Sequence, residues 1–324
     1  MIKVYTTILY CAAIFIFAGC SAGEYKGDYT NTPPYETPGE SDTGSGRQLT
    51  EVLYNGGDSY SSLYRISYDE GTVASVIKSS FCDLTKFPED NYDEMLKAGY
   101  TVTNFRYNQQ NVLFDIIYTS PELYSEYYDI SLDGSFKAVK MSVVSSLGET
   151  WNADFFYLEN GYLQSVKCRQ EYPDANENMV TLRECSLVYT YNREAVQTMV
   201  YTVKDNDGKV TETIYSFYGL DFPNKGGIMH PDLDNGFYAM GPLMYGGMIG
   251  KIPEKLHNKC IYETVIDGVP EKINLTSSYE YDQYGYITEI TRTTEYGEIY
   301  PDAALRSASA KSVGKYLYKY DDRD

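Results

Sequence analysis

The sequence has few of the residues on which most enzyme chemistry depends. It contains only two histidines, His230 and His257, and one tryptophan among its 324 residues. Two histidines leave little room for histidine-based acid–base or nucleophilic catalysis. Long hydrophobic runs are scarce as well. The apolar segment near the start, Ile8 to Phe17, is ten residues long, whereas a membrane-spanning helix needs roughly 20 apolar residues.

Binding and catalytic motifs are missing or incomplete. His257 and Cys260 form an H-x-x-C pair, but no further ligands lie nearby in the sequence, so an ordinary loop is favoured over a zinc site. The stretch "DLDNG" at 232–236 lacks the glutamate of a calcium loop, and turn chemistry explains it. No motif singles out a catalytic pair among the many acids. We therefore predict no catalytic residue, no metal site and no cofactor.

Positive charge is also in short supply. The chain has 27 lysines and arginines against 46 acids, a net charge of −19. Such an excess of acid argues against nucleic acid or an anionic lipid surface as a partner of the folded body. A neutral or cationic ligand is compatible with it.

The first residues have the plan of an export signal, with Lys3 followed by the short apolar core. Phe17-Ala18-Gly19-Cys20 resembles the lipobox of bacterial lipoproteins, in which the cysteine is acylated and becomes the new N-terminus. We therefore expect a signal peptide over 1–19 and a lipid on Cys20. Residues 20–47 are rich in Gly, Pro, Ser and Thr and lack apolar periodicity, which predicts a disordered tether with a reach of about 30 Å.

Residues 48–324 read as one all-β domain. Stretches such as "FYLENGYLQSVKC" at 156–168 and "YEYDQYGYITEI" at 279–290 join two β-rich runs through a short turn that contains glycine. Their succession predicts a single curved antiparallel sheet or a small barrel-like meander of hairpins. One or two short helices are expected, at 88–99 and 301–311. Lys167, Arg169 and Glu171 share one strand face, which a lipid-facing barrel would not present.

One hairpin can be aligned in detail. Pairing residues whose numbers sum to 353 sets Val166 against Leu187 and Cys168 against Cys185, and it also matches opposite charges on the other face. In an oxidising compartment Cys168 and Cys185 are candidates for a disulfide worth about 3 kcal/mol. Directly opposed cysteines are geometrically awkward, so two buried free thiols remain the alternative.

Tyrosine is abundant, with 36 residues, many of them on the predicted strands. Tyrosine is a good β-former that suits half-wet sheet faces, which is a sufficient structural explanation. The functional alternative is a platform on which exposed rings stack against sugars, with Tyr281 and Tyr286 as the contacts.

Together the lipobox, the tether, the repeated hairpins and the segment at 224–256 resemble an uncharacterised family of Bacteroidota lipoproteins with a porin-like fold. Asn224-Lys225 and Gly250-Lys251 carry the likeness within that segment. The resemblance implies a curved or closed antiparallel sheet and brings no functional residues with it.

The function expected from these observations is that of a non-enzymatic binding or accessory protein. It would be anchored to the outer membrane by its lipid and would face the periplasm or the cell surface, with a glycan as one ligand class. Two alternatives remain. One is a carrier of a lipid or other apolar molecule, with the Met-containing segment 241–250 as a lid. The other is a hydrolase of surface polysaccharide.

Overall fold

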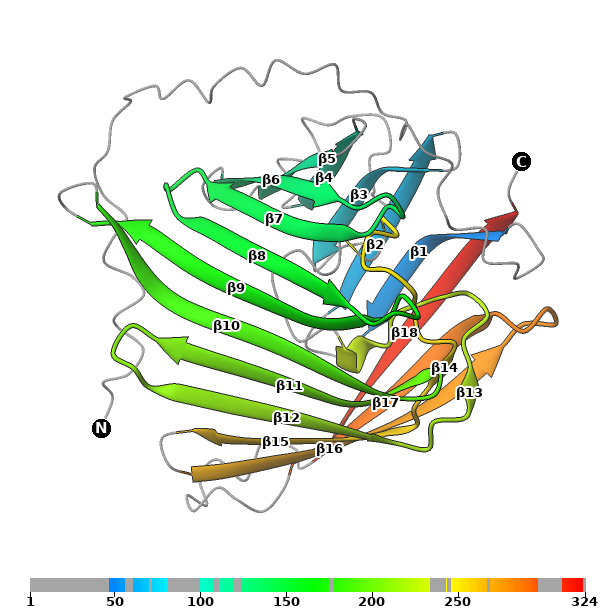
Figure 1. Cartoon of the computed structure of the whole chain (residues 1–324). Helices are drawn as coiled ribbons and strands as arrows, with labels where there is room; N and C mark the ends of the chain where they lie inside the picture. The colour runs from blue at the N-terminus through cyan, green and yellow to red at the C-terminus, as the bar shows by residue number, and fades with distance from the viewer. Residues whose placement is uncertain are drawn as a thin grey trace.

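The computed structural model describes residues 47–322, except for 56–60, 70–71, 81–99, 108–110, 119–123, 175–177, 234–242, 244–245, 267–268 and 297–310. Within the described ranges, sixteen strands pair side by side and the last pairs with the first. They form a closed antiparallel barrel (Figure 1). The all-β prediction is confirmed, and the barrel is the form that the sheet takes. Both predicted helices, at 88–99 and 301–311, lie outside the described residues, apart from Lys311, which begins the last strand.

The strands follow one another around the barrel in sequence order. They are β1 (Arg47–Asn55), β2 (Ser61–Asp69), β3 (Thr72–Ser80), β4 (Tyr100–Tyr107), β5 (Asn111–Tyr118), β6 (Tyr124–Leu132), β7 (Ala138–Ser145), β8 (Thr150–Tyr157), β9 (Leu163–Pro173), β10 (Met179–Asn192), β11 (Ala195–Asp205), β12 (Val210–Tyr218), β15 (Lys259–Ile266), β16 (Val269–Tyr281), β17 (Ile287–Tyr296) and β18 (Lys311–Asp322). Between β12 and β15 the chain leaves the wall.

Acidic turns set the strand pairing, as the sequence predicts. The Asp282 carboxylate accepts hydrogen bonds from the backbone N–H groups of Tyr284 and Tyr286, each at 2.9 Å, and Asp133 does the same for Ser135 and Lys137. Gly285 completes the first of these turns with a φ of 86°, a conformation that costs glycine little. Each turn therefore closes its hairpin through local interactions.

Around the two cysteines, the register of β9 against β10 is the predicted one, and an irregularity between Thr181 and Arg183 shifts it by one residue beyond that point. Cys168 lies opposite Cys185, Val166 opposite Leu187 and Arg169 opposite Glu184. Beyond the paired residues, the rings of Tyr162 and Tyr191 stack with their centroids 4.8 Å apart. Side-chain patterning fixed this register because a slip of one residue would turn every apolar side chain outward.

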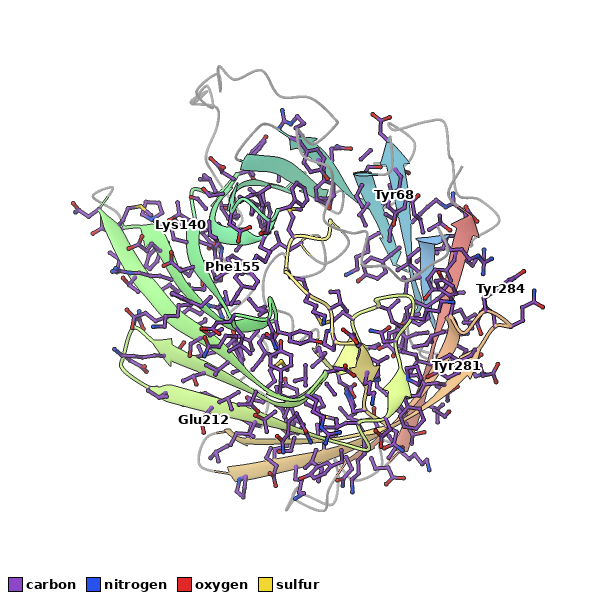
Figure 2. The ribbon with its side chains drawn as sticks, turned by 45° about the vertical axis from the view of Figure 1, so that its right-hand side comes forward. Tyr68, Lys140, Phe155, Glu212, Tyr281 and Tyr284 are labelled. Carbon is purple, nitrogen blue, oxygen red and sulfur yellow. The ribbon has the colours of Figure 1, made fainter. Side chains whose placement is uncertain are left out.

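The wall is apolar inside and polar outside. On β7, β8 and β9 the buried positions include Met141, Val143, Trp151, Ala153, Phe155 and Val166, and the exposed positions between them include Lys140, Ser142, Asn152, Asp154, Lys167 and Arg169. Figure 2 shows Phe155 on the inner side of the wall and Glu212 on its outer side. A membrane-spanning barrel has the reverse arrangement, with an apolar band outside. No helix among the described residues is long and apolar enough to cross a membrane.

The described residues of 219–258, which we call the inner segment, run inside the ring of strands (Figure 1). The segment contains β13 (Phe222–Pro223), the 3-10 turn η2 (Pro231–Leu233) and β14 (Lys255–Leu256). Four of its side chains belong to the same core cluster as the wall residues: Leu233, Leu243, Met248 and Ile249. Full burial of one such side chain contributes about 1.5–3 kcal/mol. The inner segment therefore packs against the inner face of the wall.

The inner segment is bonded to one end of the barrel. Ala138 donates its backbone N–H to the carbonyl of Met248 at 2.8 Å, and Lys251 donates to the carbonyl of Gly161 at 2.9 Å. Lys225 donates through Nζ to the carbonyl of Tyr284. These partners lie in alternate hairpin turns, which an up-and-down barrel places at the same end. That end also carries the first residue of β1, because Arg47 forms an ion pair with Asp282 in the same turn as Tyr284.

Candidate functional site

The inner segment carries both histidines of the chain and places them beside one aspartate. His230 immediately precedes η2, Asp232 lies within η2, and His257 lies between β14 and β15. Arg292 reaches the same carboxylate from β17 in the wall, 60 residues further along the chain. The site therefore depends on the way in which the inner segment enters the barrel.

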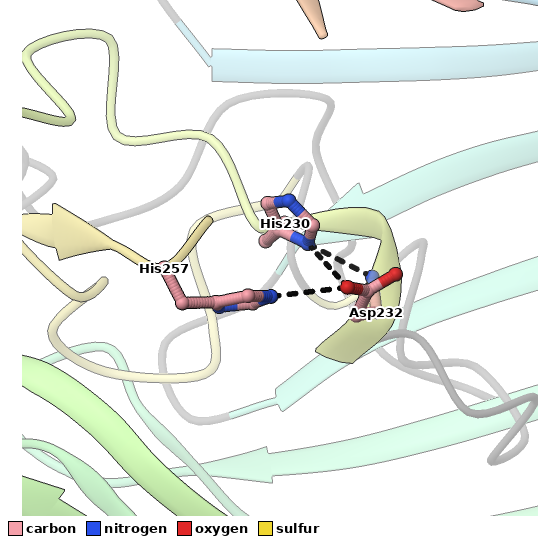
Figure 3. A group of neighbouring side chains, drawn as sticks. All are labelled: His230, Asp232 and His257. Carbon is pink, nitrogen blue, oxygen red and sulfur yellow. Dashed lines mark hydrogen bonds and ion pairs between the residues drawn. The ribbon is translucent and has the colours of Figure 1, made fainter. Parts of the chain in front are cut away.

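Asp232 is the centre of this histidine–aspartate cluster (Figure 3). His257 Nε2 lies 3.0 Å from Asp232 Oδ2, and His230 Nδ1 lies 3.5 Å from the same oxygen. Arg292 donates through Nη1 to Asp232 Oδ1 at 3.2 Å. One oxygen of the carboxylate thus faces the two imidazoles, and the other faces the guanidinium.

The cluster is shielded from water. Asp232 is 5% exposed, His257 2% and His230 0%. The two imidazole centroids are 4.0 Å apart, and the Phe217 ring lies 4.4 Å from that of His257. Tyr279, on β16, donates its hydroxyl to the backbone carbonyl of His257. Aromatic side chains and the wall therefore hold both imidazoles in place.

Burial by itself would raise the pKa of Asp232, but its three partners outweigh that effect. His230, His257 and Arg292 together hold the pKa of the carboxyl well below its usual range, because a nearby positive or hydrogen-bonded group favours the charged form. Burial, helped by His257 and Arg292, lowers the pKa of His230 well below its usual value. The cluster at neutral pH therefore combines an ionised carboxylate with a neutral His230 imidazole.

The hydrogen bonds of His230 leave its polar atoms poorly satisfied. The backbone N–H of Asp232 donates to His230 Nδ1 at 3.1 Å, so Nδ1 is an acceptor and the ring proton is on Nε2. Nε2 is buried and has no hydrogen-bond partner. Nδ1 also lies 3.5 Å from Asp232 Oδ2, an acceptor to which this tautomer cannot donate a proton. A buried polar group in this condition costs about 1–3 kcal/mol.

No activated nucleophile accompanies the cluster among the described residues. Cys260, on β15, is the nearby thiol on the wall, and burial raises its pKa far above the usual value. A protonated, buried thiol is a poor nucleophile. The chemistry that this arrangement supports is the binding of a cation by two imidazole nitrogens and a carboxylate oxygen.

The described residues that the sequence predicts as disulfide or ligand sites lie outside this cluster. Cys168 and Cys185 face each other inside the wall and are free thiols in the structure. Burial, with a smaller contribution from Cys185, raises the pKa of Cys168 to about 12. The disulfide is thus absent from the structure and stays a prediction for the oxidised protein. A thiol count in denaturant, against the Cys168→Ser/Cys185→Ser double variant, tests it. Cys20 lies outside the described residues.

The two tyrosines proposed as ligand contacts differ from each other. Tyr281 is 37% exposed, whereas Tyr286 is 2% exposed and belongs to a core cluster with Tyr320. The prediction of an exposed stacking face is wrong for Tyr286, because its ring is packed under Arg47 and Lys225. Tyr284, in the same turn, is the more exposed ring.

Sequence reasoning missed the histidine–aspartate cluster. It compared "DLDNG" with a calcium loop and assigned it to turn chemistry, and it considered His257 only together with Cys260, as a zinc pattern. The signal that could have revealed the site is the placement of both histidines within the segment that interrupts the hairpins. The distance in sequence between His230 and His257 hid their contact.

Comparison with solved structures identifies the fold. A porin-like protein from Bacteroides uniformis has a TM-score of 0.57 and 12% identity, with 86% of this chain and 98% of the other covered. A porin-like protein from Bacteroides vulgatus has a TM-score of 0.52 and 13% identity, with 85% and 98% covered. The chain has a porin-like fold. No protein-family model and no curated protein matches the sequence.

Proposed function

We propose that the chain is a lipid-anchored, non-enzymatic binding or accessory protein of the outer membrane, with a barrel that is filled and not a channel. The observation that carries this proposal is the inner segment. Its residues Met248 and Ile249 pack in the same core as wall residues such as Phe155 and Val166. A water-filled pore needs a polar lumen, and the core around Met248 and Ile249 is apolar.

The outer surface of the wall supports the same conclusion. Lys140, Asp154 and Lys167 point outward from three neighbouring strands and are exposed. Burial of such charges in the hydrocarbon of a bilayer would cost several kcal/mol. The barrel is better suited to water, with membrane attachment supplied by a lipid on Cys20.

The position of β1 gives this attachment a direction. The proposed tether ends at Arg47, at the end of the barrel where the inner segment bonds to the hairpin turns. The filled end would then be the end closer to the anchor. Membership of the Bacteroidota lipoprotein family is part of the proposal, and the shared porin-like fold supports it.

The ligand class best supported on the outer surface is a glycan. Tyr281 and Tyr284 are exposed on the β16–β17 hairpin and lie together at the rim of the molecule (Figure 2). Tyrosine rings with one free face stack on sugars and lose little conformational entropy. Arg47 covers part of Tyr284 from 5.4 Å, which adds a hydrogen-bond donor beside the ring.

A carrier of an apolar molecule is the second candidate, and one observation favours it. Tyr201 and Tyr215 pack against the inner core yet stay partly exposed, so solvent reaches part of the interior. The lid assigned to 241–250 is a weaker part of this idea. Leu243, Met248 and Ile249 are buried in the core, where they act as packing and not as a cover.

Bilayer recordings and cell fractionation test the main proposal. The full chain expressed in a bacterium should be found in the membrane fraction and should incorporate radiolabelled palmitate, and Cys20→Ala should lose the label. The purified lipoprotein should give no conductance when it is added to a planar bilayer. A stable, step-wise conductance would contradict the filled barrel, and a labelled Cys20→Ala variant would contradict the anchor.

A separate measurement distinguishes the two ligand classes. Native mass spectrometry of the lipoprotein, released from detergent, should show the mass of the protein with its own lipid alone if the interior carries no cargo. A further apolar adduct would favour the carrier. Retention on a glycan array that disappears in the Tyr281→Ala/Tyr284→Ala double variant would favour the sugar platform.

A further inference from the structure

We propose that His230, Asp232 and His257 form a binding site for one divalent transition-metal ion, with Zn²⁺ as the probe. One ligand atom from each residue lies within 4.8 Å of the other two. All three side chains are buried. Two neutral imidazole nitrogens and a carboxylate oxygen are a ligand set that zinc and its neighbours in the transition series bind well.

The distances fit a metal of this size. With bonds of about 2.0–2.1 Å to nitrogen and oxygen, the ligand atoms of a tetrahedral zinc ion are roughly 3.3 Å apart. Asp232 Oδ2 is 3.0 Å from His257 Nε2 and 3.5 Å from His230 Nδ1. The distance between the liganding nitrogens of His230 and His257, which is at most 4.8 Å, is the one that must shorten when a metal binds.

The proton arrangement gives the metal a role. His230 Nδ1 carries the single free lone pair of its ring, which accepts the backbone N–H of Asp232, and it lies 3.5 Å from Asp232 Oδ2. A bound metal would take that lone pair in place of the hydrogen bond. A cation between them would convert two opposed acceptors into two ligands. His257 Nε2, which lies 3.0 Å from Asp232 Oδ2, would bind the metal in the neutral tautomer that carries the ring proton on Nδ1.

Arg292 orients the carboxylate for this role. Its Nη1 holds Asp232 Oδ1 at 3.2 Å, so Oδ2 is left facing the two imidazoles. Hydrogen bonds from a second layer of residues usually fix carboxylate ligands in this way. A bound ion would join the inner segment to itself across 25 residues and, through Asp232 and Arg292, to the wall.

Zinc retention by the full chain is the first test. The lipoprotein, purified in detergent, is stripped with a chelator, unfolded and refolded with Zn²⁺, desalted, and analysed for metal. We expect about one zinc per chain in the wild type. His230→Gln and Asp232→Asn should each weaken binding by at least about tenfold. Asp154→Asn, which removes an exposed carboxylate of the outer wall, is the matched control and should retain the metal.

A second measurement needs no variant. Co²⁺ in the wild type should give the intense visible spectrum of a four- or five-coordinate ion without a thiolate charge-transfer band, which excludes the cysteines as ligands. Zn²⁺, but not Mg²⁺, should raise the unfolding midpoint of the wild type. A correctly folded wild type that retains no zinc and shows no such spectrum overturns the proposal, as does equal retention by His230→Gln. The cluster would then be a structural cross-link alone.

Discussion

The barrel wall and the inner segment satisfy their polar groups by different means. In the wall, nearly every strand pairs with the strands before and after it in sequence, and long ladders of backbone hydrogen bonds join them. In the inner segment, β13 and β14 contribute a ladder of two residue pairs, and the side chains of Asn224 and Asp232 supply further bonds. The wall spreads its stability over many equivalent bonds, whereas the inner segment depends on a few scattered backbone bonds and on side chains such as Asn224 and Asp232.

The wall and the inner segment should differ most in the loss of unfolding free energy when one ion pair is removed from each. Asp232→Asn leaves Arg292 and the two imidazoles without their carboxylate, and loss of one partner of a buried pair costs about 3–5 kcal/mol. Glu263→Gln breaks the exposed pair with Lys272 on the outer wall, which is worth about 0–1 kcal/mol. Urea unfolding of metal-free protein measures both. Equal losses would show that the cluster does not stabilise the inner segment.

The next largest difference in unfolding free energy should come from shortening one apolar side chain in each region. Met248 is 0% exposed inside the barrel, so Met248→Ala leaves a cavity and should cost about 2–5 kcal/mol. Val144 points outward from β7, and Val144→Ala should change the free energy of unfolding by about 0.5 kcal/mol or less. Thermal unfolding followed by circular dichroism compares the two. A small effect of Met248→Ala would mean that the inner segment is not packed against the wall in solution.

Asn224 gives a third comparison, at the start of the inner segment. Its side-chain Nδ2 donates to the carbonyls of Ile228 and Pro253 at 2.7 and 2.8 Å, and its Oδ1 accepts from the N–H of Ile228. Asn224→Ala leaves these buried groups unpaired and should cost about 2 kcal/mol. Asn152→Ala, at an exposed position of the outer wall, is the control. In Asn224→Ala, backbone amide hydrogen exchange should become faster in the inner segment and stay unchanged in the wall. An equal increase in the wall would show that Asn224 does not stabilise the inner segment separately.

The smallest effect on stability is expected where β1 pairs with β18 and closes the wall. Glu51 on β1 bonds to Lys319 on β18 and to Arg65 on β2. Burial tends to raise its pKa, but these two cations lower the pKa below the ordinary value of 4.5. The group therefore stabilises the fold fully above pH 4.5, and its contribution is lost as the pH falls through the lower, folded-state value.

Glu51→Gln should remove that part of the acid dependence, worth about 1 kcal/mol or less. The difference in unfolding free energy between wild type and variant, measured from pH 7 downward, should shrink as the acid limit is approached. A difference that stays constant with pH would assign the effect to packing and not to charge.

Much of the wall could be predicted from the sequence because its information is local. The turn at Asp133-Gly134 and the apolar alternation around Val166 specify a hairpin and its register without reference to distant residues. The predicted export signal and the lipobox-like stretch that ends at Cys20 are likewise local patterns. Tyr286 was misassigned because alternation gives the face of a strand but not what covers it, and here Arg47, Lys225 and Tyr320 cover the ring.

The sequence by itself determined an all-β chain of hairpins, the strand register that places Cys168 opposite Cys185, and a body whose outer faces carry charge. Only the tertiary structure decided that the sheet closes, that the described part of the inner segment turns inward, and that His230, Asp232, His257 and Arg292 meet. The physical reason is the distance along the chain over which each kind of interaction acts. Turn chemistry and side-chain alternation act over a few residues, whereas closure of the barrel and a cluster assembled across 60 residues depend on contacts that no short pattern encodes.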